Sequence, residues 1–168
     1  MASLWKKIDK SALKLALLCA ALLLPIVLLV GSGMYHQYRY RTFLYALSDA
    51  TVYCSQNDSL CARQEEAQPL RVTEENAYAL YFLFTKKQAK PRYTAPEGSP
   101  QLVLDYGSGA VMECWRCKME ESARRSYGIF FRFTSPEGKV WMFDTDDLSL
   151  STLQQRLLPE ENAPWTAP

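Results

Sequence analysis

The most pronounced hydrophobic pattern in the chain is an uninterrupted apolar run near its N-terminus. Residues 15–34 are twenty consecutive positions without a charged side chain, and most of them are Leu, Ala, Ile or Val. At about 1.5 Å per residue, a helix of this length spans roughly 30 Å, which matches the hydrocarbon core of a bilayer. The pattern predicts a transmembrane signal-anchor helix over residues 15–34, preceded by a cytoplasmic segment, residues 1–14.

The next part of the chain has helical patterns separated by polar segments. Residues 35 to about 53 contain neither Pro nor Gly and predict a helical stalk that continues the membrane helix. Residues 54–69 are polar and predict a loop. Thr73, two acidic residues and then Ala77, Leu80, Tyr81 and Phe84 predict a capped amphipathic helix over residues 73–90. A loop rich in proline follows over residues 91–100.

Beyond residue 100 the apolar period changes to two, which is typical of strands. Alternation predicts strands over residues 102–106, 110–119, 129–133 and 139–145, with turns at residues 107–109 and 135–138. A last helix, capped by Asp146 or Asp147, follows with its leucines spaced by three and four. We therefore expect an α+β domain over residues 35–158, in which a helix, a four-stranded antiparallel meander and a C-terminal helix follow the stalk. We expect residues 159–168 to be disordered.

Charges flanking the apolar run predict its orientation. Four lysines precede the run and two arginines, Arg39 and Arg41, follow it closely. Because Lys and Arg are retained on the cytoplasmic side, the N-terminus is predicted to be cytoplasmic and the C-terminus outside, across the plasma membrane if the host is bacterial. The alternative is a signal peptide cleaved near residues 31–33, although the apolar run exceeds the usual 7–15 residues of such a segment.

Composition excludes several classes of function. The chain carries a formal net charge of +1, and the part after the apolar run has 15 basic and 17 acidic residues. Since no basic run appears, a nucleic-acid partner is not expected. The single histidine, His36, lies beside the apolar run, which argues against triad hydrolases. We predict no cofactor, and no metal either, since the spacing of the cysteines does not suit zinc.

Four cysteines lie after the apolar run. In an oxidising compartment an even number of cysteines suggests disulfides, although the sequence leaves three pairings open. The simplest candidate is a bridge between Cys54 and Cys61, which would close the polar loop.

Cys114 and Cys117 form a CxxC motif, which in thiol oxidoreductases lies at the start of a helix. Here the motif lies in an alternating run, and positions three apart in a strand point to opposite faces. A structural role is therefore favoured, and a membrane-tethered thiol–disulfide oxidoreductase using these two cysteines is the alternative.

These observations favour a binding or structural role rather than an enzyme. Aromatic residues of the last two predicted strands could leave one sheet face for a protein partner; they are Phe130, Phe131, Phe133, Trp141 and Phe143. A second alternative is a small accessory subunit of a membrane complex, in which Pro25, Gly31 and Gly33 would allow close helix approach. The lipid bilayer itself is the partner predicted for residues 15–34.

Overall fold

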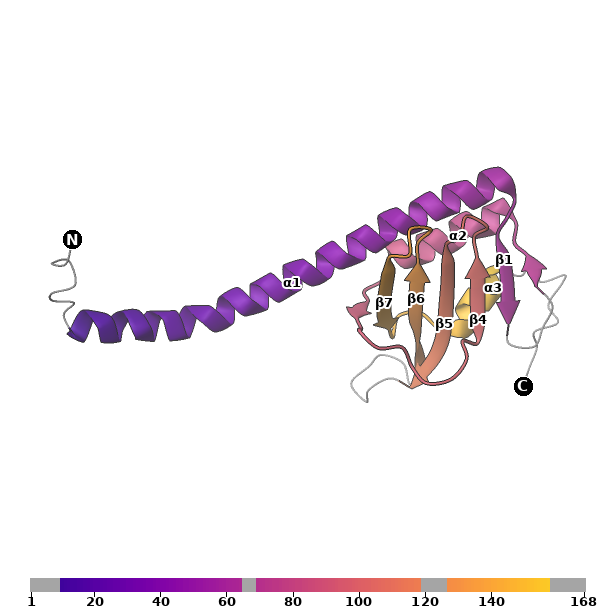
Figure 1. Cartoon of the computed structure of the whole chain (residues 1–168). Coiled ribbons are helices and arrows are strands. Elements are labelled where there is room, and N and C mark those ends of the chain that lie inside the picture. Colours follow the sequence, from indigo (N-terminus) through magenta and orange to yellow (C-terminus); the bar gives the residue numbers. More distant parts are fainter. Residues whose placement is uncertain (1–9, 65–68, 119–126, 158–168) are drawn as a thin grey trace. The chain divides into compact units, whose positions relative to one another are not determined.

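The computed structural model describes residues 10–64, 69–118 and 127–157 (Figure 1). Within these ranges the chain forms three helices and seven strands. In chain order they are α1 (Lys10–Asn57), β1 (Cys61–Gln64), β2 (Leu70–Arg71), α2 (Glu74–Thr85), β3 (Lys90–Pro91), β4 (Leu102–Asp105), β5 (Val111–Lys118), β6 (Tyr127–Thr134), β7 (Val140–Thr145) and α3 (Leu150–Leu157). The expected tail over residues 159–168 and the segment 1–9 lie outside the described residues.

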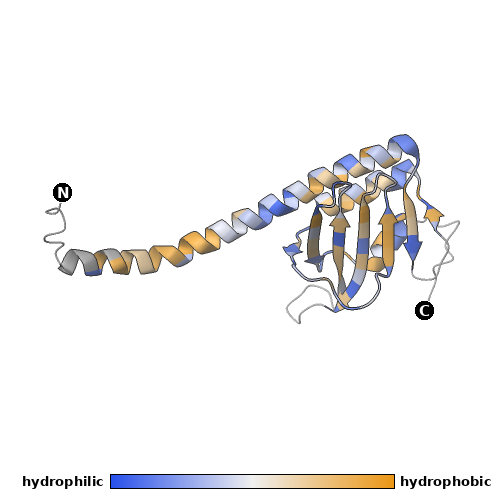
Figure 2. Ribbon diagram, viewed as in Figure 1, coloured by the Kyte–Doolittle hydropathy of each residue, from blue (hydrophilic) through white to orange (hydrophobic). Residues whose placement is uncertain are grey.

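The chain divides into two units, Met1–Tyr38 and Arg39–Pro168, and α1 contributes residues to both. In the first unit the described large apolar side chains of α1 are exposed, and the ribbon of this part of α1 is coloured mainly as hydrophobic in Figure 2. Among the described residues, this is the one helix long and apolar enough to cross a membrane. The predicted apolar N-terminal helix is thereby confirmed.

The second unit is built on a seven-stranded antiparallel sheet with the order β2-β1-β4-β5-β6-β7-β3. The four consecutive strands β4 to β7 are the predicted meander, but the prediction that the sheet consists of these four strands alone is wrong. β2 and β3 have two residues each, too few for an alternation to be read. β1 has two apolar residues followed by two polar ones, Cys61 to Gln64, so it carries no alternation either. β3 also contains Pro91, which is typical of an edge strand and which the sequence presents as a loop residue.

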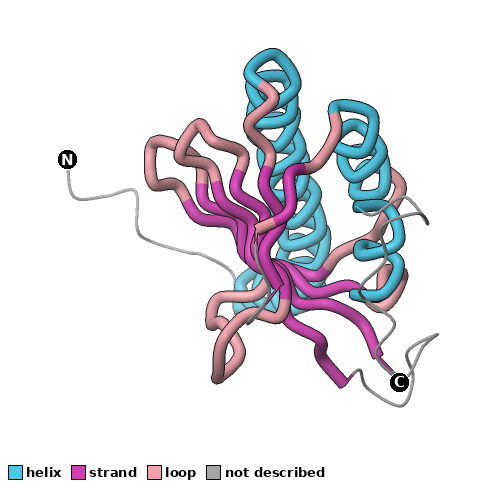
Figure 3. Tube along the Cα trace, turned by 90° about the vertical axis from the view of Figure 1, so that its right-hand side faces the viewer, coloured by secondary structure: helices cyan, strands magenta, loops and turns pink. Residues whose placement is uncertain are grey.

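One face of the sheet is covered by helices. The part of α1 in this unit, α2 and α3 lie on the same side of the strands (Figures 1 and 3). Phe131 and Phe133 of β6 and Phe143 of β7 point to this side, and all three rings contact Phe43 of α1 at centroid distances of 5.4–5.7 Å. Phe84 of α2 closes the cluster, with its ring 6.0 Å from that of Phe43. This aromatic core holds the helices on the sheet.

Local sequence explains how α1 packs and where it ends. Its buried residues Phe43, Leu47, Ala50 and Cys54 are spaced by four, three and four, so they form one stripe along the helix. The helix ends at Asn57 rather than near residue 53. Asp58 then adopts a φ of 49°, and the Ser59 amide, 3.1 Å away, donates to the carbonyl of Cys54. This is a Schellman-type end, in which an Asp tolerates the left-handed conformation that usually takes glycine.

The two shorter helices begin at side-chain caps. The hydroxyl of Thr73 accepts from the amide of Asn76 at 3.4 Å, which confirms the predicted start of α2. α2 ends at Thr85, five residues earlier than predicted, because the chain turns there toward β3. α3 is capped by Ser149, whose hydroxyl accepts from the amide of Thr152 at 3.3 Å, and not by an aspartate as predicted.

One glycine allows a close approach of two loops. Gly107, in the turn between β4 and β5, has a φ of 74°, and a Cβ built on it would lie 2.4 Å from the Cβ of Ser59. The Ser59 hydroxyl donates to the carbonyl of Tyr106 at 2.8 Å, so the end of α1 is fastened to this turn. Any larger residue at position 107 would push the two loops apart.

Candidate functional site

The face of the sheet opposite the helices, termed here the outer face, is the candidate site of the second unit. On β5 it carries Glu113, Trp115 and Cys117, and the register places them beside Arg132, Phe130 and Gly128 of β6. Strand alternation explains this arrangement, since Cys114 and Phe131, one position along each strand, point to the helices. The outer face thus combines aromatic, charged and thiol side chains.

The two aromatic residues of the outer face pack against each other. The Trp115 and Phe130 rings lie 5.3 Å apart at an interplanar angle of 72°, an edge-to-face arrangement. Although no helix covers them, the two residues are only 4% and 3% exposed. Another part of the chain must therefore cover this pair.

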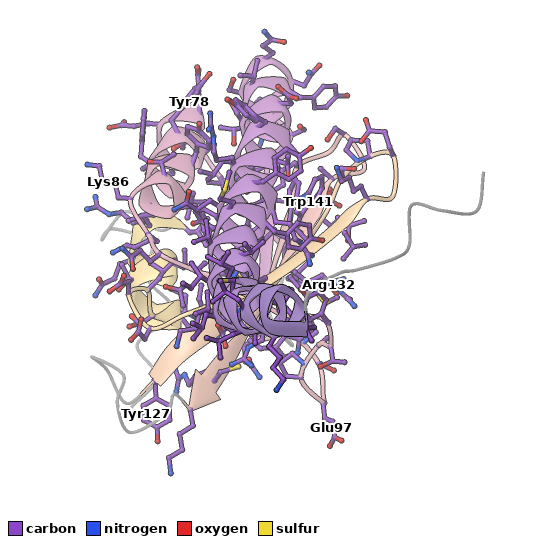
Figure 4. The ribbon with its side chains drawn as sticks, turned by 90° about the vertical axis from the view of Figure 1, so that its left-hand side faces the viewer. Tyr78, Lys86, Glu97, Tyr127, Arg132 and Trp141 are labelled. Carbon is purple, nitrogen blue, oxygen red and sulfur yellow. The ribbon has the colours of Figure 1, made fainter. Side chains whose placement is uncertain are left out.

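Residues 92–101, termed here the covering segment, supply hydrogen bonds to this part of the sheet. The indole Nε1 of Trp115 donates to the carbonyl of Gly98 at 3.1 Å, and the backbone amide of Arg116 donates to Oε1 of Gln101 at 2.8 Å. Glu97, in the middle of the segment, points away from the domain at the tip of the loop (Figure 4). A loop between β3 and β4 thus takes the role that helices have on the other face.

An ion pair borders the aromatic pair. The guanidinium of Arg132 donates to the carboxylate of Glu113, and its Cζ lies 5.5 Å from the centroid of the Trp115 ring. This hydrogen bond raises the pKa of Arg132 further, so the cation persists at every working pH. Arg132 therefore covers one face of the Trp115 indole, and the carboxylate of Glu113 balances the charge of the guanidinium.

A second ion pair ties the start of the covering segment to β7. Arg92 donates to Oδ2 of Asp144, a carboxylate that is almost fully buried, and its amide donates to the carbonyl of Met142 at 2.9 Å. In the part of the chain that the structure describes, the other carboxylate oxygen of Asp144 has no hydrogen-bond partner. Arg92 thus places a counter-charge beside the buried carboxylate of Asp144.

The structure places the two cysteines of the CxxC motif on opposite faces of β5. Cys114 is fully buried under the helices, and Cys117 is half-buried on the outer face. Burial raises the pKa of both thiols, for Cys114 with a smaller contribution from the neighbouring Glu113. A redox pair needs adjacent sulfurs and a thiol of lowered pKa, so this arrangement does not suit thiol–disulfide exchange.

Cys54 and Cys61 are also free thiols, and the predicted disulfide between them has no support in the structure. Cys54 faces the helix-covered core, where its thiol donates to the carbonyl of Thr51 at 3.2 Å. Cys61 precedes Ala62, which is buried in that core, so its own side chain points to the other face of the sheet. The longer α1 removes the flexible loop that the bridge was expected to close.

These environments predict different thiol reactivities. Burial raises the pKa of Cys54 to about 11, so at pH 7.5 very little of it is thiolate, the reactive form. We expect iodoacetamide to modify half-buried Cys61 well before Cys54 or Cys114, and denaturant to remove the difference. Peptide mass spectrometry over a time course measures the order. Labelling of Cys114 as fast as that of Cys61 would contradict the buried position.

Sequence reasoning placed some of these residues and missed others. Of the five aromatic residues proposed for a partner surface, only Phe130 lies on the outer face, and the other four belong to the core. Trp115, Arg132 and the covering segment were missed. The alternation of β5 placed Trp115 on the same face as Cys117. No pattern in the sequence indicates that residues 92–101 cover Trp115.

The outer face offers aromatic contacts, ion pairs and hydrogen bonds to a binding partner. In residues 10–64, 69–118 and 127–157, no three His, Cys, Asp or Glu side chains are close enough to hold a metal ion. Comparisons of the chain with known protein families, curated proteins and solved structures found no match.

Proposed function

We propose that the protein is a single-pass membrane protein that displays the α+β domain outside the cytoplasm, where the domain has a binding or structural role. The observation that carries this proposal is the exposure of the apolar run. Along residues 17–30 the described leucine, isoleucine and valine side chains are 57–72% exposed, and no part of the described structure covers them. Contact between so many apolar side chains and water would be strongly unfavourable, whereas in a bilayer they contact the hydrocarbon chains of the lipid.

The outer face supports the proposed binding role. Trp115, Phe130 and Arg132 are residue types that dominate protein interfaces, and here a loop covers them rather than a helix. A partner that displaced the covering segment, or that bound beside it, could contact the Trp115–Phe130 pair and the two ion pairs of this face. The oxidoreductase alternative is not proposed, because the sulfurs of Cys114 and Cys117 lie on opposite faces of the sheet.

Reporter fusions to the full chain test the topology. Alkaline phosphatase fused after Pro168 is active only outside the cytoplasm, whereas a green fluorescent protein folds and fluoresces inside. We expect phosphatase activity with little fluorescence, and we expect the chain to stay in the membrane pellet after a carbonate wash. Fluorescence without phosphatase activity would reverse the orientation, and a mature N-terminus near Met34 would replace the anchor by a cleaved signal peptide.

A further inference from the structure

We propose that one end of the domain binds the anionic headgroups of the bilayer that holds residues 15–34. This surface, termed here the basic end, consists of residues 39–41, 86–90 and 92–93. The inference rests on the proposed membrane anchor and adds a second, electrostatic contact between the protein and the lipid.

Two segments that are distant in the sequence, residues 39–41 and residues 86–93, meet at the basic end, beside the end of β7. The hydroxyl of Tyr40 donates to the carbonyl of Phe84 at 2.7 Å, which fixes the end of α2 beside α1. The hydroxyl of Thr145 donates to the carbonyl of Gln88 at 2.7 Å, which fixes the following turn beside β7. Figure 4 looks onto this side of the domain, with Lys86 at the end of α2.

The covering segment begins at the same end. The guanidinium carbon of Arg39 lies 5.2 Å from the centroid of the Tyr93 ring, and Tyr93 is 67% exposed. Aromatic residues of this kind are enriched at membrane–water interfaces, where the ring sits at the level of the headgroups. The basic end thus joins a cation and an exposed aromatic ring on one surface.

Positive charge dominates this surface. Asp144 is balanced by Arg92, and Asp146 and Asp147 follow Thr145 and offset part of the remaining charge. The cations of the basic end are Arg39, Arg41, Lys86, Lys87, Lys90 and Arg92, so the balance among these named groups is positive. The whole part of the chain after the apolar run is slightly acidic, so these cations are concentrated at one place rather than spread evenly.

The length of chain between the apolar run and the basic end makes lipid the fitting partner. Tyr40 lies six residues after Met34, so even a fully extended chain keeps it within about 22 Å of the end of the apolar run. The attraction between an anionic membrane and a cation acts over a Debye length of about 8 Å at physiological ionic strength, a range that a surface tethered so closely can enter. A soluble partner would have to compete with a charged membrane surface to which the anchor tethers these residues.

Hydrogen–deuterium exchange of the full chain in nanodiscs tests the proposal. One set of nanodiscs contains phosphatidylcholine alone, and the other contains equal parts of phosphatidylcholine and phosphatidylglycerol. We expect the amides of residues 86–93 to exchange about threefold more slowly, or more, in the anionic nanodiscs, and roughly 0.5 M salt to remove the difference.

Two triple variants with the same change in net charge locate the effect. Lys86→Gln, Lys87→Gln and Lys90→Gln together should abolish the lipid-dependent slowing. The matched control is Arg63→Gln, Arg71→Gln and Arg156→Gln, three exposed cations outside the basic end, and it should retain the slowing. For Arg63 the separation is clear: β1 is four strands from β7, about 19 Å across the sheet. Unchanged exchange in β5 and β6 verifies that each variant is folded.

The outcomes separate this inference from the proposed anchor. Equal exchange in both lipids, or equal loss in the two triple variants, would overturn the inference while leaving the chain in the membrane. Release of the unmodified chain by a carbonate wash would instead overturn the anchor, and the inference with it. The comparison of lipids uses the unmodified chain, so it decides the matter even if a variant does not fold.

Discussion

Replacing Phe43 by alanine should reduce the free energy of unfolding of the domain by about 3–5 kcal/mol, the usual range for a buried phenylalanine. Phe43 is fully buried, and its ring contacts five other aromatic rings from α1, α2, β6 and β7. Its removal leaves a cavity at the point where two helices meet the sheet. Urea unfolding of the full chain in detergent micelles, followed by tryptophan fluorescence, measures the loss.

Tyr45 provides the matched control, because it lies on the same helix two residues away and is 64% exposed. Tyr45→Ala should change the free energy of unfolding by no more than about 0.5 kcal/mol. If Phe43→Ala costs less than about 1 kcal/mol, α1 does not pack on the sheet through this residue, and the layered arrangement is wrong.

Two arginines in the middle of the apolar run should release the chain from the membrane. Leu23→Arg with Val27→Arg places two charges near the centre of the predicted span. Each costs roughly 2.5–3.5 kcal/mol on the insertion scale, so together they cost roughly 5–7 kcal/mol. We expect most of the variant in the supernatant after a carbonate wash, where immunoblotting of both fractions quantifies it.

The control keeps the same positions and removes side-chain volume without adding charge. Leu23→Ala with Val27→Ala leaves the run uncharged, and this variant should remain in the membrane pellet. Retention of the arginine variant at the level of the unmodified chain would mean that residues 15–34 do not lie in the hydrocarbon core.

The elements that follow long, regular patterns were predictable from the sequence. The apolar run, the helix that begins after Thr73 and the alternating strands β4 to β7 all extend over enough residues for a period to be read. The remaining strands are formed by tertiary contacts. β1 pairs with β4 and β3 pairs with β7 across long sequence separations, and neither has an alternation of its own. Local pattern cannot reveal such pairings.

The candidate site was less predictable than the fold, for a related reason. The alternation of β5 assigns Cys114 and Cys117 to opposite faces, which the sequence alone indicates. Tertiary packing of α1 and α2 determines which face of the sheet the helices cover. Phe131 and Phe143 point to that face, so they belong to the core. The cover over Trp115 depends on a hydrogen bond from its indole to Gly98, in a loop whose path no periodicity describes.

The short strands at the two borders of the sheet bear on how copies of the protein can coexist. Proteins held in one membrane meet at high local concentration and with similar orientation, conditions that favour strand-to-strand polymerisation. Here the outermost strands, β2 and β3, offer two residues each, and Pro91 lacks the amide that a neighbouring strand would need. Such borders are poor templates for main-chain pairing, so crowded copies should remain separate folded units rather than extend one another's sheets.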